Sequence, residues 1–148
     1  MSDWQPKIVV FLCQWSLKAD REWEQRFELP PHVRVVEVPC SGRVNPLLVV
    51  SALQRGADGV LVVGCEPGHC HYKNGNYLGR RKYATLGSFL QYLGLEKERL
   101  QVTLLDETEG SRFHVVVQNL LDKVRSLGPA DALAVRQPMA CVSQMERE

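Results

Sequence analysis

The chain has 148 residues, of which 45% are hydrophobic and 24% are charged, and its formal net charge is +1. This length and composition are typical of one globular domain with its own core. The nearly neutral net charge does not indicate binding to nucleic acid. No apolar run approaches the ~18 residues of a membrane span. Residues 1–7 lack the pattern of a secretion signal, so we expect a cytoplasmic protein.

The predicted elements alternate between strand and helix along the chain. Short apolar runs predict strands at residues 7–12, 33–38, 57–64 and 100–105. Caps, breakers and helical periodicity predict helices at residues 20–27, 45–56, 77–93 and 111–127. This order predicts an α/β fold, with a single flavodoxin-like, doubly wound parallel sheet of about four strands and helices on both faces. We assign residues 1–129 to this domain and residues 130–148 to a C-terminal tail with weak periodicity.

Four of the five cysteines fall where the predicted strands end. Cys13, Cys40 and Cys65 each follow an apolar run, and Cys70 lies in the loop after the third strand. Parallel strands end at one edge of a sheet, and sites form there where the strand order reverses, so the four thiols should converge. One such cysteine alone is more often a small buried hydrophobic residue, whereas four together indicate a metal or redox site. The odd number of cysteines also argues against a disulfide framework.

The cysteines by themselves leave the kind of site open. Four thiolates are the usual ligands of a [2Fe–2S] or [4Fe–4S] cluster and also of structural zinc. A zinc-binding interaction module would combine Cys65 and Cys70 with another cysteine and with His69 or His71. A thiol-redox or sulfur-carrier protein would instead use Cys13 or Cys70 as a reactive thiolate.

Charged side chains flank the cysteines in the sequence. Basic residues near them would offset the negative charge of a bound cluster, and these are Arg43, His69, His71 and Lys73. Acidic residues after the fourth strand are interpreted as a partner-facing surface, and these are Asp106, Glu107 and Glu109. The run Arg80-Arg81-Lys82 is interpreted as the solvated face of the long helix. No catalytic triad, phosphate-binding glycine loop or carboxylate pair has a convincing context, which favours a protein that is not a catalyst alone.

Three cysteine motifs follow one another in a specific order. They are Phe11-Leu12-Cys13-Gln14-Trp15, Cys40-Ser41-Gly42-Arg43 and Gly64-Cys65-Glu66-Pro67-Gly68-His69-Cys70-His71-Tyr72. Further matching segments are Gly75-Asn76-Tyr77, Arg80-Arg81 and residues 95–100. In this order the motifs resemble the family of the small iron–sulfur delta subunit of methyl-viologen-reducing (F420-non-reducing) hydrogenase. The resemblance spans residues 7–128.

The resemblance implies an electron-transfer subunit with one [2Fe–2S] cluster held by Cys13, Cys40, Cys65 and Cys70. It also implies partners in a multisubunit oxidoreductase complex of anaerobic metabolism. The subunit would relay electrons between a hydrogenase or other dehydrogenase module and a flavin-containing, heterodisulfide-reductase-A-like subunit.

Position 16 departs from the family pattern. The family usually has a second cysteine three residues after the first, and Ser16 stands there in this chain. Either position 16 is dispensable for the cluster, or Ser16 marks a member whose cluster is altered or lost. Cys141, in the predicted tail, has no companion cysteine and stays unassigned.

Overall fold

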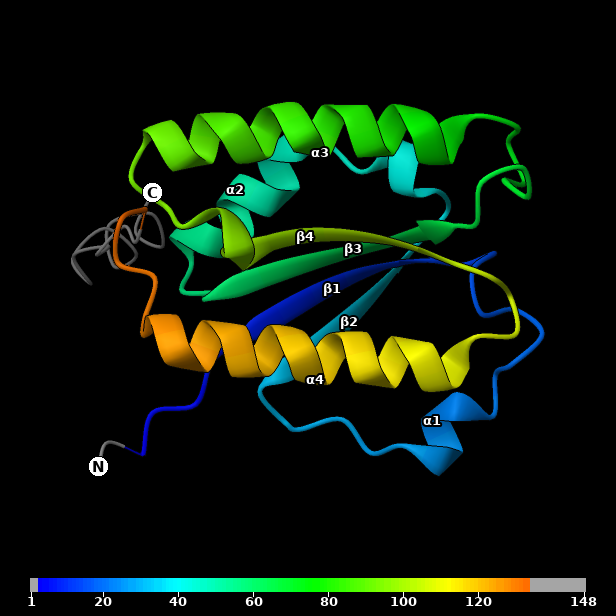
Figure 1. Cartoon of the computed structure of the whole chain (residues 1–148), viewed down its shortest axis with the longest axis horizontal. Coiled ribbons are helices and arrows are strands. Elements are labelled where there is room, and N and C mark those ends of the chain that lie inside the picture. Colours follow the sequence, from blue (N-terminus) through cyan, green and yellow to red (C-terminus); the bar gives the residue numbers. More distant parts are fainter. Residues whose placement is uncertain (1–2, 134–148) are drawn as a thin grey trace, which may run out of the picture.

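A four-stranded parallel sheet lies between two layers of helices (Figure 1). The computed structural model describes residues 3–133. The strands are β1 (Ile8–Cys13), β2 (Val33–Val38), β3 (Gly59–Cys65) and β4 (Leu100–Leu105). Every neighbouring pair is parallel, and the strand order is β2-β1-β3-β4. This order is that of a flavodoxin-like, doubly wound sheet, so the predicted fold is confirmed.

Each face of the sheet has its own helices (Figure 1). Helices α2 (Pro46–Gln54) and α3 (Gly75–Tyr92) cover one face, and α1 (Trp23–Arg26) and α4 (Gly110–Leu127) cover the other. Two short 3-10 helices, η1 (Ser41–Arg43) and η2 (Lys97–Arg99), precede α2 and β4. The predicted start of the second helix is confirmed, because the Asn45 side chain accepts a hydrogen bond from the Leu47 N–H at 2.9 Å.

Two helices differ at their ends from the prediction. Helix α1 is a single turn rather than the whole of residues 20–27, because Asp20 is held outside it. The Asp20 carboxylate accepts hydrogen bonds from Arg26 at 2.7 Å and from the Gly110 N–H at 2.9 Å, which caps the start of α4. Helix α3 begins at Gly75, before the predicted residue 77, and thereby approaches the cysteine loops.

The core lies on both faces of the sheet because strand side chains alternate between them. In β1, Ile8 and Leu12 pack with the apolar stripe of α4, whereas Phe11 packs with the helices of the opposite face. All seven residues of β3 are buried, as a continuous apolar run predicts for a central parallel strand. The central strands are therefore fixed by packing on two sides, and their carboxyl ends are rigid platforms for a site.

Arg99 and Asp58 fasten the end of α4 to the amino-terminal edge of the sheet, opposite the cysteines. The buried Arg99 guanidinium donates to Glu96 Oε2 at 2.6 Å, to Asp58 O at 3.0 Å and to Gly128 O at 2.7 Å. The Asp58 carboxylate in turn accepts a hydrogen bond from the Ala130 N–H at 3.0 Å. These bonds satisfy backbone groups that burial would otherwise leave without partners.

The first residues of the predicted tail contact the domain. Ala130 is buried, and Leu133 packs against the core beside α2 and α3. The rest of the tail, including Cys141, lies outside the described residues. Among residues 3–133, no helix combines the length and the apolar character needed to cross a membrane.

Candidate metal centre

The strand order reverses between β1 and β3, and two cysteines end these two strands. From β1 the chain crosses to β2 on one side, and from β3 it crosses to β4 on the other. Cys13 is the last residue of β1 and Cys65 the last residue of β3. Both are buried, and their Sγ atoms lie 3.7 Å apart. The two thiols thus occupy the position where open α/β sheets form their sites.

The other two cysteines meet at the first residue of α3. Cys40 follows β2 and is buried, and Cys70 lies in the loop between β3 and α3 and is half-buried. A Cβ atom added to Gly75 would lie 2.5 Å from Cys40 Sγ and 3.5 Å from Cys70 Sγ. Only glycine therefore leaves room for both sulfur atoms at this helix start.

The sulfur atoms of Cys13 and Cys65 form a close pair, and those of Cys40 and Cys70 both lie beside Gly75. Two thiolates on one tetrahedral metal, with metal–sulfur bonds of about 2.3 Å, are about 3.8 Å apart. The Cys13–Cys65 distance of 3.7 Å agrees with that separation. Within residues 3–133, however, no three cysteine sulfur atoms lie within 4.8 Å of one another. Burial raises the pKa of the Cys40 thiol, and the charge of the nearby Cys70 raises it further.

Crowding of the thiols perturbs their protonation. The pKa of Cys13 is lowered chiefly by its hydrogen bond with Cys65, and the pKa of Cys65 is raised by that same bond and by burial. Burial also raises the pKa of Cys40, and the charges of Cys70 and Cys13 raise it further. Four thiolates at this edge would repel one another, so a bound cation would stabilise their deprotonated forms.

Backbone N–H groups face the sulfur atoms and favour the thiolates. The N–H groups of Trp15, Ser16 and Ser41 lower the pKa of Cys13. The N–H of Gly42 lowers the pKa of Cys40, and that of His71 lowers the pKa of Cys65. The positive end of the α3 dipole adds to this, because the helix begins beside Cys40 and Cys70. An anionic iron–sulfur cluster needs such N–H donors, so the residues present fit one.

Helix α3 also fixes the loop that carries Cys40. The Tyr83 hydroxyl donates to Ser41 O at 3.2 Å and to Val44 O at 2.9 Å, and Lys82 Nζ donates to Gly42 O at 2.8 Å. Burial lowers the pKa of Lys82, and the charge of the nearby Cys40 thiolate opposes this only in part. The interpretation of Arg80-Arg81-Lys82 as a solvated run is therefore wrong for Lys82, which is half-buried, and correct for its two neighbours. Only the tertiary fold brings residue 82 to residue 42.

Ser16 uses its hydroxyl within the fold. It is buried, and its Oγ donates to Leu105 O, at the end of β4, at 3.3 Å. Its backbone N–H donates to Cys13 O at 3.1 Å. The Ser16 hydroxyl thus connects the loop after Cys13 to the end of β4, a role that does not require the hydroxyl to face the sulfur atoms.

Trp15 is a stacked aromatic residue beside the site. Its indole stacks on His71, with ring centroids 3.5 Å apart and planes within 9°, and Lys18 Nζ lies 4.1 Å from its ring centroid. Trp15 and Cys65 both line an open cavity of about 470 Å³. Within the described part of the chain, Trp15 Nε1 is buried without a hydrogen-bond partner. A sulfur acceptor beside Cys65 would suit this donor.

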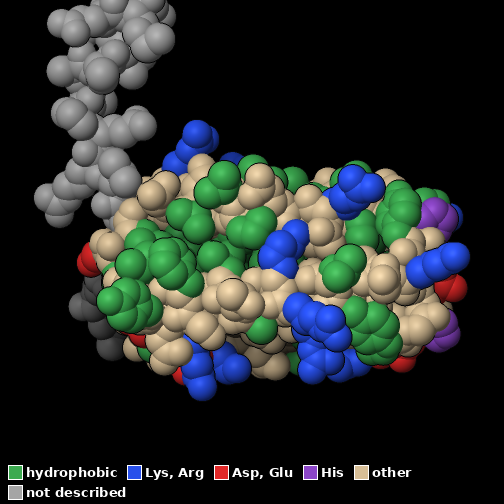
Figure 2. Space-filling model, turned by 90° about the horizontal axis from the view of Figure 1, so that it is seen from above, with side chains coloured by type: hydrophobic (Ala, Val, Ile, Leu, Met, Phe, Trp, Pro, Cys, Tyr) green, Lys and Arg blue, Asp and Glu red, His purple; other side chains and the backbone are tan. Residues whose placement is uncertain are grey.

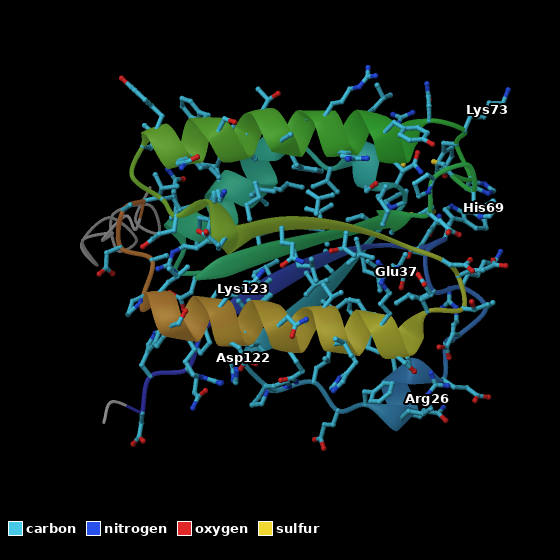
Figure 3. The ribbon with its side chains drawn as sticks, in the orientation of Figure 1. Arg26, Glu37, His69, Lys73, Asp122 and Lys123 are labelled. Atoms are coloured by element: carbon cyan, nitrogen blue, oxygen red, sulfur yellow. The ribbon has the colours of Figure 1, made fainter. Side chains whose placement is uncertain are left out.

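The remaining predicted residues lie around the rim. Figure 3 shows His69 and Lys73 projecting from the loop between β3 and α3, at the end of the molecule that holds the cysteines. His69 is exposed, and its Nδ1 lies 3.2 Å from Glu66 Oε2. Asp106 joins Glu66 and His69 in a partly exposed cluster that lines the same cavity.

A family model described as the methyl-viologen-reducing hydrogenase delta subunit matches residues 8–128. The chain belongs to this family. The delta-subunit family thus covers the whole sheet and all four cysteines of the site. One relative is the iron–sulfur subunit of the F420-non-reducing hydrogenase of Archaeoglobus profundus, which is 44% identical over 86% of this chain and 94% of that protein. The iron–sulfur subunit of the vhc F420-non-reducing hydrogenase of Methanococcus voltae is 40% identical over 86% of this chain and 90% of that protein.

A delta-subunit-like segment also occurs inside a longer relative. This relative is a heterodisulfide reductase polypeptide of Methanosarcina acetivorans, from the ferredoxin/F420H2-dependent CoB-CoM enzyme, and it is 37% identical over 84% of this chain. The matching segment makes up 16% of that protein. The same fold unit therefore exists both as a separate chain and as part of a heterodisulfide reductase polypeptide.

Proposed function

We propose that this chain is an electron-transfer subunit of a multisubunit oxidoreductase complex and carries one [2Fe–2S] cluster on Cys13, Cys40, Cys65 and Cys70. The observation that carries the proposal is the meeting of these four thiols, in two pairs, at the carboxyl edge of the sheet. The relatives named as iron–sulfur subunits of hydrogenases support the same class of cofactor. When bound, such a cluster accepts and returns electrons at a potential set by its surroundings.

The pairing of the thiols favours two metal ions over one. Cys13 and Cys65 would hold one iron, and Cys40 and Cys70 the other, which agrees with the 3.7 Å separation of the first pair. A mononuclear zinc site would need all four sulfur atoms within about 3.8 Å of one another. A reactive thiol carrier that uses Cys13 is also disfavoured, because Cys13 is buried against Cys65.

The chain's own residues would set the environment of the cluster. Backbone N–H groups and Lys82 offset negative charge at the sulfur atoms. The burial of Cys13, Cys40 and Cys65 excludes water from one side. Cys70, the most exposed of the four, lies where a redox group of a partner can approach most closely.

The partners in this proposal are a hydrogenase or other dehydrogenase module and a flavin-containing, heterodisulfide-reductase-A-like subunit. The hydrogenase subunits among the relatives support the first. The heterodisulfide reductase polypeptide of Methanosarcina acetivorans supports the second, because a segment built into it is similar to this chain. A separate subunit with the same fold would bind to the remainder of such a protein and pass electrons to it.

The decisive experiment is anaerobic reconstitution of the purified chain with iron and sulfide. We expect about two irons and two labile sulfides per chain, a visible charge-transfer spectrum and an EPR signal after reduction. Single serine variants of Cys13, Cys40, Cys65 and Cys70 should each lose most of the iron, whereas Cys141→Ser should retain it. A colourless protein with about one zinc per chain would contradict the proposal. Four irons per chain would contradict the cluster type.

A further inference from the structure

The outer face of α2 and α3 exposes more large apolar side chains than the opposite face. These are Leu47 and Leu48 on α2 and Tyr77, Leu78, Phe89 and Tyr92 on α3. On α4, within the described residues, Val115 is the one exposed large apolar side chain. Several exposed large apolar side chains on one face of a domain indicate an interaction site.

The same face is basic. Residues 39–57 and 67–95 contain no Asp or Glu, and their six Lys and Arg residues are Arg43, Arg55, Lys73, Arg80, Arg81 and Lys82. Figure 2 looks onto this face and shows hydrophobic and basic side chains gathered there, with acidic side chains at its margins. Since the net charge of the whole chain is +1, the rest of the chain is net negative. The charge is therefore distributed asymmetrically rather than scattered.

Apolar and basic groups alternate along one side of α3. Leu78, Arg81, Phe89 and Tyr92 follow the spacing i, i+3, i+11 and i+14, which places them on one stripe of a helix. Leu78 and Phe89 are each 55% exposed, and Tyr92 is 87% exposed. Aromatic residues and arginine are enriched at protein–protein interfaces, where they supply much of the binding energy.

This stripe starts beside the metal centre. The first residue of α3, Gly75, lies beside the sulfur atoms of Cys40 and Cys70, and Lys82 Nζ on the same helix donates to Gly42 O in the Cys40 loop. A protein seated on α3 would therefore lie next to Cys70, the most exposed of the four cysteines. This position places a docked partner where it can exchange electrons over a short distance.

We propose that the outer face of α2 and α3 docks an acidic, partly apolar surface of a heterodisulfide-reductase-A-like subunit, and this rests on the function proposed above. The carboxylates of that partner pair with Arg80 and Arg81, and its apolar residues cover Leu78 and Phe89. A second copy of this chain does not suit the face, because two faces that each expose Arg80 and Arg81 would repel one another. The heterodisulfide reductase relative favours this partner, because its polypeptide includes a segment similar to this chain.

The test compares two matched double variants of the reconstituted chain. Leu78→Ser with Arg81→Glu alters the stripe on α3, and Val115→Ser with Lys123→Glu alters α4 in the same way. Leu78 and Val115 are similarly exposed, at 55% and 53%, and Figure 3 shows Lys123 on α4. Binding to the purified heterodisulfide-reductase-A-like subunit of the same host is measured by calorimetry in low and high salt. Iron content, visible spectrum and thermal melting are recorded for every variant.

The α3 double variant should bind more weakly by about tenfold or more, while the α4 double variant binds within about twofold of the unaltered chain. Affinity of the unaltered chain should fall with salt. Failure of the unaltered chain to bind, or equal weakening by both double variants, overturns the docking proposal. The proposal is also overturned if the α3 double variant keeps its binding to the partner but loses a different interaction that the α4 double variant retains. Such an interaction would be dimer formation or binding to anionic phosphatidylglycerol vesicles. Because the iron content reports on the cluster separately, a failure of docking is distinguishable from a failure of the electron-transfer proposal.

Discussion

The indole of Trp15 stacks on the imidazole of His71 with ring centroids 3.5 Å apart. This contact joins the loop that follows Cys13 to the loop between β3 and α3, which carries Cys70. The charge of Lys18, 4.1 Å from the ring centroid of Trp15, strengthens the arrangement through a cation–π interaction. The two loops are thereby held together, although 56 positions separate the two rings in sequence.

We expect Trp15→Ala to make the reconstituted cluster more accessible to water and oxygen. The variant should bleach in air several-fold faster than the unaltered chain, because it lacks the indole that lines the cavity beside Cys65. Trp15→Phe retains an aromatic surface and should bleach at an intermediate rate. The measurement is the decay of visible absorbance in aerated buffer. Equal decay in all three proteins would show that the stack does not protect the site.

Gly75→Ala should prevent full occupancy of the site. The added Cβ would lie 2.5 Å from Cys40 Sγ, which is too close for any real contact, so the sulfur atom must move. Iron bound after reconstitution should fall to a small fraction of the normal value. Gly87→Ala is the matched control, because it lies in the same helix and its Cβ meets nothing within 4 Å.

The control should keep its iron and melt at the same or a higher temperature, since alanine favours a helix over glycine by about 1 kcal/mol. Normal iron content in Gly75→Ala would mean that iron binding does not require Cys40 or Cys70 to hold its position beside Gly75.

Ser16→Ala should lower the free energy of unfolding by about 1–2 kcal/mol, because the buried carbonyl of Leu105 loses its hydrogen-bond donor. Iron content and the EPR signal should stay unchanged. Ser16→Cys, which restores the family pattern, should likewise leave the spectrum unaltered. Denaturant unfolding and EPR are the two measurements. A changed EPR signal in either variant would place residue 16 among the ligands instead.

Lys82→Gln should shift the reduction potential of the reconstituted protein to more negative values. The variant removes a positive charge that acts on Cys40 and can still donate a hydrogen bond to Gly42 O. Less positive charge near the site disfavours the reduced form, by an amount on the order of tens of millivolts. Arg81→Gln, on the exposed side of the same helix, should shift the potential much less. Potentiometric titration followed by EPR distinguishes the two, and equal shifts would contradict a specific role for Lys82.

Arg99→Met should strongly destabilise the domain without changing any residue of the metal centre. It leaves the carbonyl groups of Asp58 and Gly128 without a donor in a buried environment. The free energy of unfolding should fall by about 3 kcal/mol. Arg112→Met removes an exposed ion pair with Glu109 and should change it by less than ~1 kcal/mol. Denaturant unfolding at neutral pH is the measurement, and a small effect of Arg99→Met would refute its structural role.

The sequence alone was sufficient for the strands, their parallel arrangement and the edge at which the cysteines gather. Runs such as Ile8–Cys13 and Gly59–Cys65 are apolar and rich in β-branched residues, so local composition determines that they are buried strands. Turn and cap residues are similarly local signals, and Asn45-Pro46 correctly marked a helix start. The length of α1 was overestimated, because the contacts of Asp20 with the start of α4 are not local.

Only the tertiary structure decided how the cysteines pair and what surrounds them. The contact between Cys13 and Cys65 depends on β1 and β3 being neighbours, and strand order is a property of the whole sheet. The contacts of Ser16 with Leu105, Lys82 with Gly42 and Trp15 with His71 each join segments distant in sequence. Such contacts leave no periodicity or motif, because they depend on side-chain packing across the folded sheet. Local chemistry therefore determined which residues gather at this edge, and packing determined which atoms meet.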